Sequence, residues 1–225
     1  MLTYKVLAAL LCYPTREVID SLDEMAAVLD AERALPAAER RGLQELMDQL
    51  RASDLMDAEA RYVELFDRAR SLSLHLFEHI HGESRERGQA MVDLLGHYRA
   101  QGLEIANGEL PDYLPLFLEF LSLRPPAQAR QHLAEVVDII SVLAARLEKR
   151  GTPYRAPLRA LEALAARRVD GAAIREAVAA EQPDDSPASR AAGEEAPVTF
   201  DDARTPSGCT AAASIVERFA PKPGA

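Results

Sequence analysis

The amino-acid sequence predicts an all-α protein, with a single helical domain followed by a disordered acidic C-terminal tail. Ala, Leu, Glu and Arg dominate the chain, and Val, Ile and Thr do not alternate with polar residues as they do in strands. The 225 residues are 48% hydrophobic and only 5% aromatic. That content is enough for one sizeable core and too little for two ordinary domains beside a tail. We therefore expect a helical domain over residues 1–180 and a Pro/Ala/acidic tail over residues 181–225.

Four helices are expected before residue 67, each marked by a cap or a breaker and by apolar residues at helical spacing. The first runs from Leu2 to Cys12 and stops at Tyr13-Pro14, because the residue before a proline avoids the helical conformation. The other three are a helix that Thr15 caps and that continues to Leu29, a helix from Pro36 to Leu50, and a helix that Ser53 caps and that continues through Phe66.

The segment from Asp67 to Glu83 breaks this pattern, so we expect a loop there, or a short helix with loops at each end. Ser84 can cap a further helix over residues 85–99, which Gly102 ends because glycine tolerates the left-handed conformation. The expected buried stripe of this helix is Met91, Leu95 and Tyr98. Residues 103–110 form a second irregular segment.

Prolines divide the helices of the last third. Pro111-Asp112 is expected to start the strongly apolar helix LPLFLEFLS, in which Pro115 is tolerable because it falls in the first turn. Pro125-Pro126 ends this helix. The remaining helices are expected over residues 127–149, from Pro153 through Leu164, and after Asp170 through Val178.

The composition changes to Pro, Ser, Ala, Gly and paired acids from Pro183 onward, which is typical of disorder. Near the end, Ile215, Val216 and Phe219 again stand at helical spacing. One hypothesis is that this tethered segment occupies a groove of the domain when the groove is empty, since tethering gives a high effective concentration. The alternative is a tail that only keeps the protein soluble.

Composition excludes several classes of function. A formal net charge of -10 argues against a nucleic-acid-binding surface, because phosphates would be repelled. No apolar run reaches the roughly 20 residues that span a bilayer, and we expect MLTYKVLAALLCYP to be a first helix, not a signal peptide. Cys12 and Cys209 form no CxxC, which fits a reducing cytoplasm. No glycine-rich phosphate loop is present, and no cofactor is expected.

The pentapeptide His75-Leu76-Phe77-Glu78-His79 matches H-x-x-E-H, the inverted zinc-protease pattern. On a helix, its two histidines would share one face, and its glutamate could act as the general base of a zinc-dependent hydrolase. Glu83, His97 and Glu109 are candidates for the third ligand. Alternatively, the histidines hydrogen-bond neighbouring carboxylates and pin a loop. We favour this second interpretation and expect no metal, because no sheet that could floor a hydrolase cleft is predicted.

A longer match covers residues 1 to about 170. The segments YPT, YVELFDR, SLHLFEHIHGESRERGQAM, PDYLPLFLEFL and RLEKRGTPY follow one another along the chain. Together they resemble the delta-subunit family of respiratory nitrate reductase, the NarJ-type assembly chaperones of molybdenum enzymes. The string FEHIHGESRERG is specific, unlike the five-residue zinc pattern inside it, and the resemblance fades in the acidic tail.

This resemblance implies a fold of the redox-enzyme maturation chaperone type and no enzymatic activity. It implies that the chain binds the N-terminal segment of the apo nitrate reductase catalytic (alpha) subunit in the cytoplasm. It further implies that binding favours insertion of molybdenum cofactor and iron–sulfur clusters before the enzyme docks on its membrane subunit. Molybdenum cofactor insertion proteins are candidate further partners. A chaperone of the same fold for a different molybdenum enzyme is the alternative.

A helical client peptide needs an apolar groove with polar edges, and the two irregular segments are where binding residues should gather on a rigid scaffold. The expected apolar lining is Leu114, Phe117, Leu118 and Leu121, for each of which a plain core position is an equal alternative. The expected carboxylates for a basic client are Glu78, Glu83, Glu109 and Asp112. Arg85 and Arg87 are expected to hold these carboxylates in place by ion pairing.

Three histidines complete the prediction, because imidazole titrates nearest to neutral pH and client affinity should therefore depend on pH. The predicted peptide-binding residues are His75, Glu78, His79, His81, Glu83, Arg85, Arg87, Glu109, Asp112, Tyr113 and Phe117.

Overall fold

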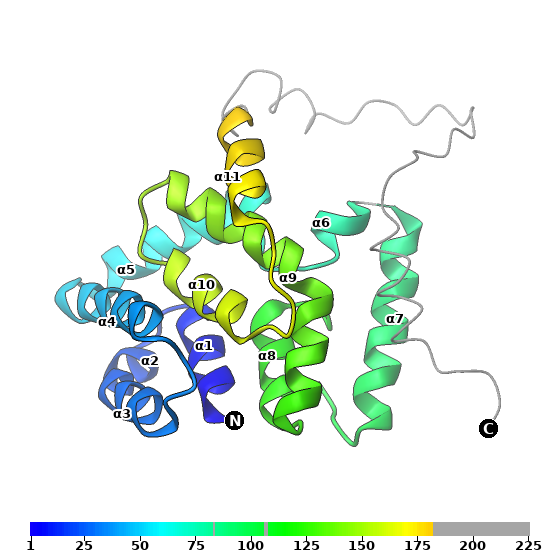
Figure 1. The fold of residues 1–225 in the computed structure, drawn as a ribbon, viewed down its shortest axis with the longest axis horizontal. Coiled ribbons are helices and arrows are strands. Elements are labelled where there is room, and N and C mark those ends of the chain that lie inside the picture. Colours follow the sequence, from blue (N-terminus) through cyan, green and yellow to red (C-terminus); the bar gives the residue numbers. More distant parts are fainter. Residues whose placement is uncertain (83, 106–107, 182–225) are drawn as a thin grey trace.

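The computed structural model describes residues 1–82, 84–105 and 108–181, and these residues are helical with no β-strand among them (Figure 1). The all-α prediction is confirmed. The α-helices are α1 (Leu2–Leu11), α2 (Arg16–Asp20), α3 (Leu22–Glu32), α4 (Ala37–Ala52), α5 (Leu55–Tyr62), α6 (Glu78–His81), α7 (Arg85–Ala100), α8 (Leu114–Ser122), α9 (Pro126–Lys149), α10 (Arg155–Leu164) and α11 (Gly171–Ala180). Two other helical turns are the π-helix η1 (Val63–Asp67) and the 3₁₀-helix η2 (Arg70–Leu72).

Four helices form the centre of the fold: α1 packs along α8, and α10 packs along α9 (Figure 1). Helix α3 covers α1, α4 covers α10, and α7 stands at one side of the body. The buried apolar residues of these helices form one continuous core. Among its members with no exposed surface are Leu7, Leu11, Leu118, Leu121, Leu133, Ile140 and Leu158. Within the described residues, no helix is long and apolar enough to cross a membrane.

Two details of the N-terminal half differ from the prediction. The expected single helix after Thr15 is two helices, because the chain turns at Ser21, whose hydroxyl donates to the Glu17 carbonyl at 2.7 Å. Thr15 does cap α2, since its hydroxyl accepts from the Val18 N–H at 3.4 Å. Helix α5 is capped by Asp54, whose carboxylate accepts from the Met56 N–H at 2.9 Å, and not by the preceding serine.

Helix α5 continues into the π-helix η1, in which the Arg68 N–H donates to the Val63 carbonyl five residues earlier at 3.0 Å. Single π turns of this kind insert one extra residue and occur frequently at functional sites. This turn buries Phe66 and leaves Asp67 exposed at its end.

Helix α7 buries a stripe adjacent to the expected one. Ala90, Leu94 and Tyr98 are buried, whereas Met91 and Leu95 are only half-buried. Neighbouring helix positions lie about 100° apart, so both stripes satisfy the same apolar spacing. Gly102 takes the left-handed conformation after the helix, with φ of 75°, as expected.

Helix α8 begins at Leu114, three residues later than predicted, and Pro115 lies in its first turn as expected. Pro111 and Asp112 form a turn before the helix, and Asp112 is completely buried. Helix α11 ends at Ala180, and we propose to keep the domain boundary there. The predicted tail, with Ile215, Val216 and Phe219, lies outside the described residues.

Candidate functional site

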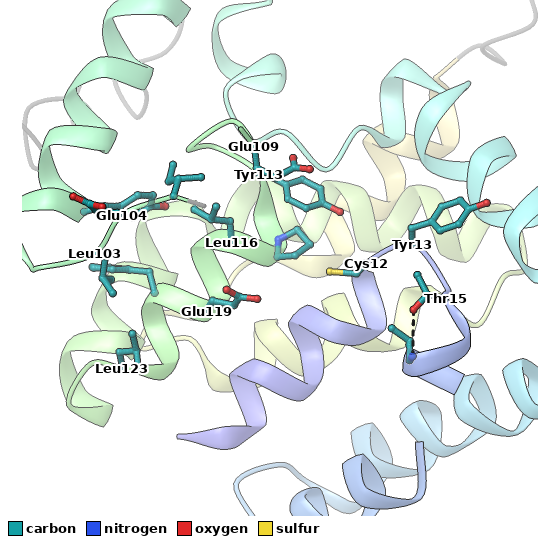
Figure 2. Close-up of a pocket in the computed structure, with 15 residues that line it drawn as sticks. Cys12, Tyr13, Thr15, Leu103, Glu104, Glu109, Tyr113, Leu116, Glu119 and Leu123 are labelled. Carbon is teal, nitrogen blue, oxygen red and sulfur yellow. Dashed lines mark hydrogen bonds between the residues drawn. The ribbon is translucent and has the colours of Figure 1, made fainter. Parts of the chain in front are cut away.

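An open pocket of about 640 Å³ lies where the end of α1 meets α8 and the segment that follows α7 (Figure 2). Figure 2 shows Leu103 and Glu104 on one side of this main pocket, Cys12 and Tyr13 on the opposite side, and Glu119 between them. The lining residues are Cys12, Tyr13, Thr15, Val18, Tyr98, Leu103, Glu104, Ile105, Glu109, Tyr113, Pro115, Leu116, Glu119, Phe120 and Leu123.

Helix α8 supplies the apolar floor of the main pocket. Its sequence is apolar nearly all round, so the helix buries one face in the core and presents a second apolar face to the pocket. The pocket face carries Leu116, Phe120 and Leu123, of which Leu123 is 53% exposed. Opposite it, Tyr13 is 41% exposed. Exposed apolar side chains around a concave surface mark a binding site for another molecule.

The polar edge of the main pocket is acidic. Glu104, Glu109 and Glu119 are exposed, and the described lining residues include no Lys or Arg. Burial, followed by the nearby charge of Glu119, raises the pKa of the Cys12 thiol to about 11. The thiol is therefore protonated at neutral pH and is not a reactive nucleophile. The pocket offers apolar contact and negative potential, and no nucleophilic chemistry at this cysteine.

Next to the main pocket, Asp112 ties two distant segments together. The Leu76 N–H donates to the Asp112 carbonyl at 3.0 Å, and the Leu114 N–H donates to the Leu74 carbonyl at 2.8 Å. These bonds form an antiparallel bridge between His75 and Tyr113. The buried Asp112 carboxylate also accepts from the Phe77 N–H at 3.1 Å. The Asp112 carboxylate faces inward and bonds within the chain, so its expected role as a carboxylate for the client stays a prediction that this geometry does not favour.

Arg87 links this buried carboxylate to the surface. Its guanidinium lies 3.0 Å from the Glu78 carboxylate and 3.7 Å from that of Asp112. The ion pairing predicted for Arg87 is confirmed. Arg85 is exposed at the first position of α7. Glu83 lies outside the described residues, so its predicted role stays a prediction.

The three histidines differ in their surroundings. His75 Nδ1 lies 3.3 Å from the Asp112 carboxylate, and this hydrogen bond, opposed in part by desolvation, raises the pKa of His75. His79 donates its Nε2–H to the Ser73 carbonyl at 2.8 Å, and desolvation lowers its pKa. The ring of His81 packs edge-on against Phe77, with centroids 5.8 Å apart. These contacts match the interpretation that the histidines pin a loop.

The zinc-hydrolase alternative fails on geometry. Helix α6 starts at Glu78, so His75 precedes it and shares no helix face with His79. One nitrogen of each histidine already faces an internal oxygen, from Asp112 or from Ser73. Across residues 1–82, 84–105 and 108–181, no three His, Cys, Asp or Glu side chains gather as metal ligands.

Of the predicted binding residues, Glu109 and Tyr113 line the main pocket, and Phe117 does not. Phe117 is only 2% exposed because it lies on the core face of α8, as do Leu114, Leu118 and Leu121. His75 and Arg87 contact the Asp112 carboxylate instead, and Glu78 pairs with Arg87. His79 bonds to the Ser73 carbonyl, and His81 packs on Phe77 and lies near Glu86. The prediction missed Leu103, Glu104, Leu116, Glu119 and Leu123. Glu119, the one charge inside an apolar run, was the available signal for the outward face of α8.

An open apolar pocket edged by carboxylates, on a helical body, describes a binding protein. The family comparison is specific: the model of the nitrate reductase delta subunit family matches residues 32–160, and the chain belongs to that family. The predicted family is confirmed, and with it the prediction that the chain is a chaperone and not an enzyme.

Three relatives illustrate the similarity. The nitrate reductase molybdenum cofactor assembly chaperone NarJ of Escherichia coli K12 is 41% identical over 201 residues, which cover 89% of this chain and 85% of the relative. The probable chaperone NarW of the same strain is 38% identical, over 81% of this chain and 76% of the relative. A probable NarJ of Bacillus subtilis 168 is 31% identical, over 68% of this chain and 82% of the relative. All three of these relatives carry the name of molybdenum cofactor assembly chaperones of nitrate reductase, two of them as probable ones.

Proposed function

We propose that this chain is the dedicated assembly chaperone of a nitrate reductase and acts in the cytoplasm. It binds the N-terminal segment of the apo catalytic (alpha) subunit. Binding favours insertion of the molybdenum cofactor and the iron–sulfur clusters before the enzyme docks at the membrane. Molybdenum cofactor insertion proteins are the candidate further partners. Membership of the delta subunit family supports the chaperone role, and the main pocket supports the mode of binding.

The observation that carries the proposal is the combination of an apolar floor with an acidic edge in the main pocket. An amphipathic helix binds such a groove through residues at i, i+3, i+4 and i+7. Helix α8 presents a matching face through Leu116, Phe120 and Leu123, which are spaced four and three residues apart. Glu104 and Glu119 lie close enough to the floor to meet basic residues on the edges of that helix.

The Asp112 turn supports this site from behind. It fixes the start of α8 against the segment before α6, so Tyr113 keeps its position at the pocket wall. The hydroxyl of the buried Tyr98 donates to the Pro111 carbonyl at 3.0 Å and fastens the same turn to α7. A preorganised wall loses less conformational entropy when a peptide binds.

Calorimetric titration with a synthetic peptide of the first residues of the nitrate reductase catalytic subunit tests the proposal. We expect saturable binding, which Glu119→Lys weakens about fivefold or more because the reversed charge repels a basic peptide. Glu119 is exposed, so the substitution should leave the fold intact. The matched control is Glu176→Lys on α11, which is also exposed and lies outside the pocket lining. Equal affinities of the two variants for the peptide would contradict the proposed location of the binding site. If the peptide does not bind the wild type, the proposed identity of the client is contradicted.

A further inference from the structure

A second, smaller pocket adjoins the main pocket. It has a volume of about 280 Å³ and shares Tyr13, Glu109 and Tyr113 with the main pocket. We call it the tyrosine pocket; its lining residues are Tyr13, Tyr62, Phe66, Asp67, Leu74, His75, Glu109 and Tyr113. The two pockets therefore meet at these shared residues, so one bound segment can contact both.

Five of the eight residues that line the tyrosine pocket carry aromatic rings. Tyr62 contacts Tyr13 edge-on at 5.6 Å between centroids and Phe66 at 4.9 Å, and His75 lies 5.3 Å from Tyr113. The buried Tyr62 hydroxyl donates to the Leu11 carbonyl at 2.9 Å. A carbonyl only accepts, so in the 3.4 Å contact between the two hydroxyls Tyr113 is the donor. The wall is thus fixed by internal bonds. Tyr62 and Phe66 are buried in it, and Tyr13 is the ring with the largest exposed surface, at 41%.

Carboxylates edge this aromatic wall. Asp67 and Glu109 are exposed, and the described lining contains no Lys or Arg. The π-helix η1 places Phe66 in the wall and Asp67 at the entrance. Partial desolvation first, and then the negative charges of Glu59 and Asp67, raise the pKa of Tyr13. Asp67 and Glu109 therefore place negative charge at the entrance. His75 in the same wall adds a positive charge when it is protonated, and its hydrogen bond to Asp112 raises its pKa.

Aromatic faces attract cations through their quadrupole, and a carboxylate beside them adds an ion pair. We propose that the tyrosine pocket is a cation subsite that receives one ammonium or guanidinium group of the client segment. The apolar face of the same segment lies in the main pocket. This inference rests on the proposed function. It adds a subsite that recognises one positive charge of the client and thereby sets the register of the client along α8.

The test couples a change in the protein to a change in the peptide. Asp67→Asn keeps the shape of the carboxylate and removes its charge. The probes are the client peptide and versions in which each Lys becomes norleucine, each Arg becomes citrulline, or the amino terminus is acetylated. These arms separate a side-chain cation from the terminal ammonium group. The control Glu64→Gln changes an exposed carboxylate on the same π turn that lies outside the tyrosine pocket.

We expect Asp67→Asn to weaken binding of the unmodified peptide about threefold to tenfold, and Glu64→Gln to leave it unchanged within about twofold. One modified peptide should bind wild type and Asp67→Asn equally well, which identifies the cation. In addition, Tyr13→Leu should lower the affinity for the unmodified peptide more than Tyr13→Phe does, because phenylalanine keeps the aromatic ring. Tyr13 is 41% exposed, so neither change empties the core.

The inference is overturned if Asp67→Asn has the same effect on every peptide, or if the client segment has no cationic group. Either result leaves the main pocket as a binding site. By contrast, a wild-type protein that binds none of the peptides would contradict the proposed function itself.

Discussion

Replacing Asp112 by alanine should destabilise the fold, because its buried carboxylate holds the turn before α8. The Asp112 carboxylate is completely buried, accepts from the Phe77 N–H at 3.1 Å and faces the guanidinium of Arg87 at 3.7 Å. Loss of the acceptor leaves a buried N–H without a partner, which costs about 1–3 kcal/mol. Loss of the charge also removes one ion-pair partner of Arg87. The Arg87 guanidinium still has the Glu78 carboxylate at 3.0 Å, so this loss costs less unfolding free energy than the loss of the acceptor.

Together these losses give about 3 kcal/mol of unfolding free energy for Asp112→Ala. Asp112→Asn retains an oxygen for the Phe77 N–H and should cost about 1 kcal/mol. The matched control is Glu109→Ala, three residues earlier and exposed, which should change stability by less than about 0.5 kcal/mol.

Urea unfolding, followed by far-ultraviolet circular dichroism, measures the free energy of unfolding of all three variants. The values are comparable if the slope of this free energy against urea concentration is the same for each variant. The expected order of stability is Glu109→Ala, then Asp112→Asn, then Asp112→Ala. If Asp112→Ala unfolds within about 0.5 kcal/mol of the wild type, the turn before α8 is not held by this carboxylate, and the reasoning fails.

Three further predictions concern pH and the tail. The raised pKa of His75 means that its protonated form stabilises the fold below about pH 6.5, and that this contribution is lost as the pH rises through the raised value. His75→Gln should therefore cost more stability in mildly acid than in mildly alkaline urea titrations; an equal cost at both would refute this. Protonated His75 also places a positive charge in the tyrosine pocket, so the affinity for a cationic client should fall on acidification, and a flat calorimetric profile would contradict it. For the tail, the hypothesis of self-occlusion predicts that deleting residues 184–225 raises client affinity, and unchanged affinity would refute it.

The helices were predictable because apolar spacing and caps are local properties of the sequence. Thr15 and Pro115 stand where local rules place them. The break at Ser21 was missed because a single serine is compatible with helix, and only its hydroxyl bond to the preceding turn marks the end. Periodicity also could not choose between neighbouring stripes of α7, since residues 90 and 91 point less than a third of a turn apart.

The candidate site was less predictable because it depends on contacts between distant segments. The bridge between His75 and Tyr113 joins residues far apart in the sequence, and it buries the carboxylate of Asp112 that an isolated turn would expose. On α8, a run that is apolar on all sides does not reveal which face meets the core. Phe117 therefore looked as suitable for the groove as Leu116, although only Leu116 lines it.

The central claim is that the main pocket holds the N-terminal segment of the nitrate reductase catalytic subunit. Its most direct test is to follow backbone amide resonances of the isotope-labelled chain while this peptide is added. We expect the largest shifts at residues 12–18, 103–105, 109 and 113–123, and nearly unchanged resonances in α4 and α11. Saturable shifts centred on α4 or α11, with the pocket segments unaffected, would contradict it.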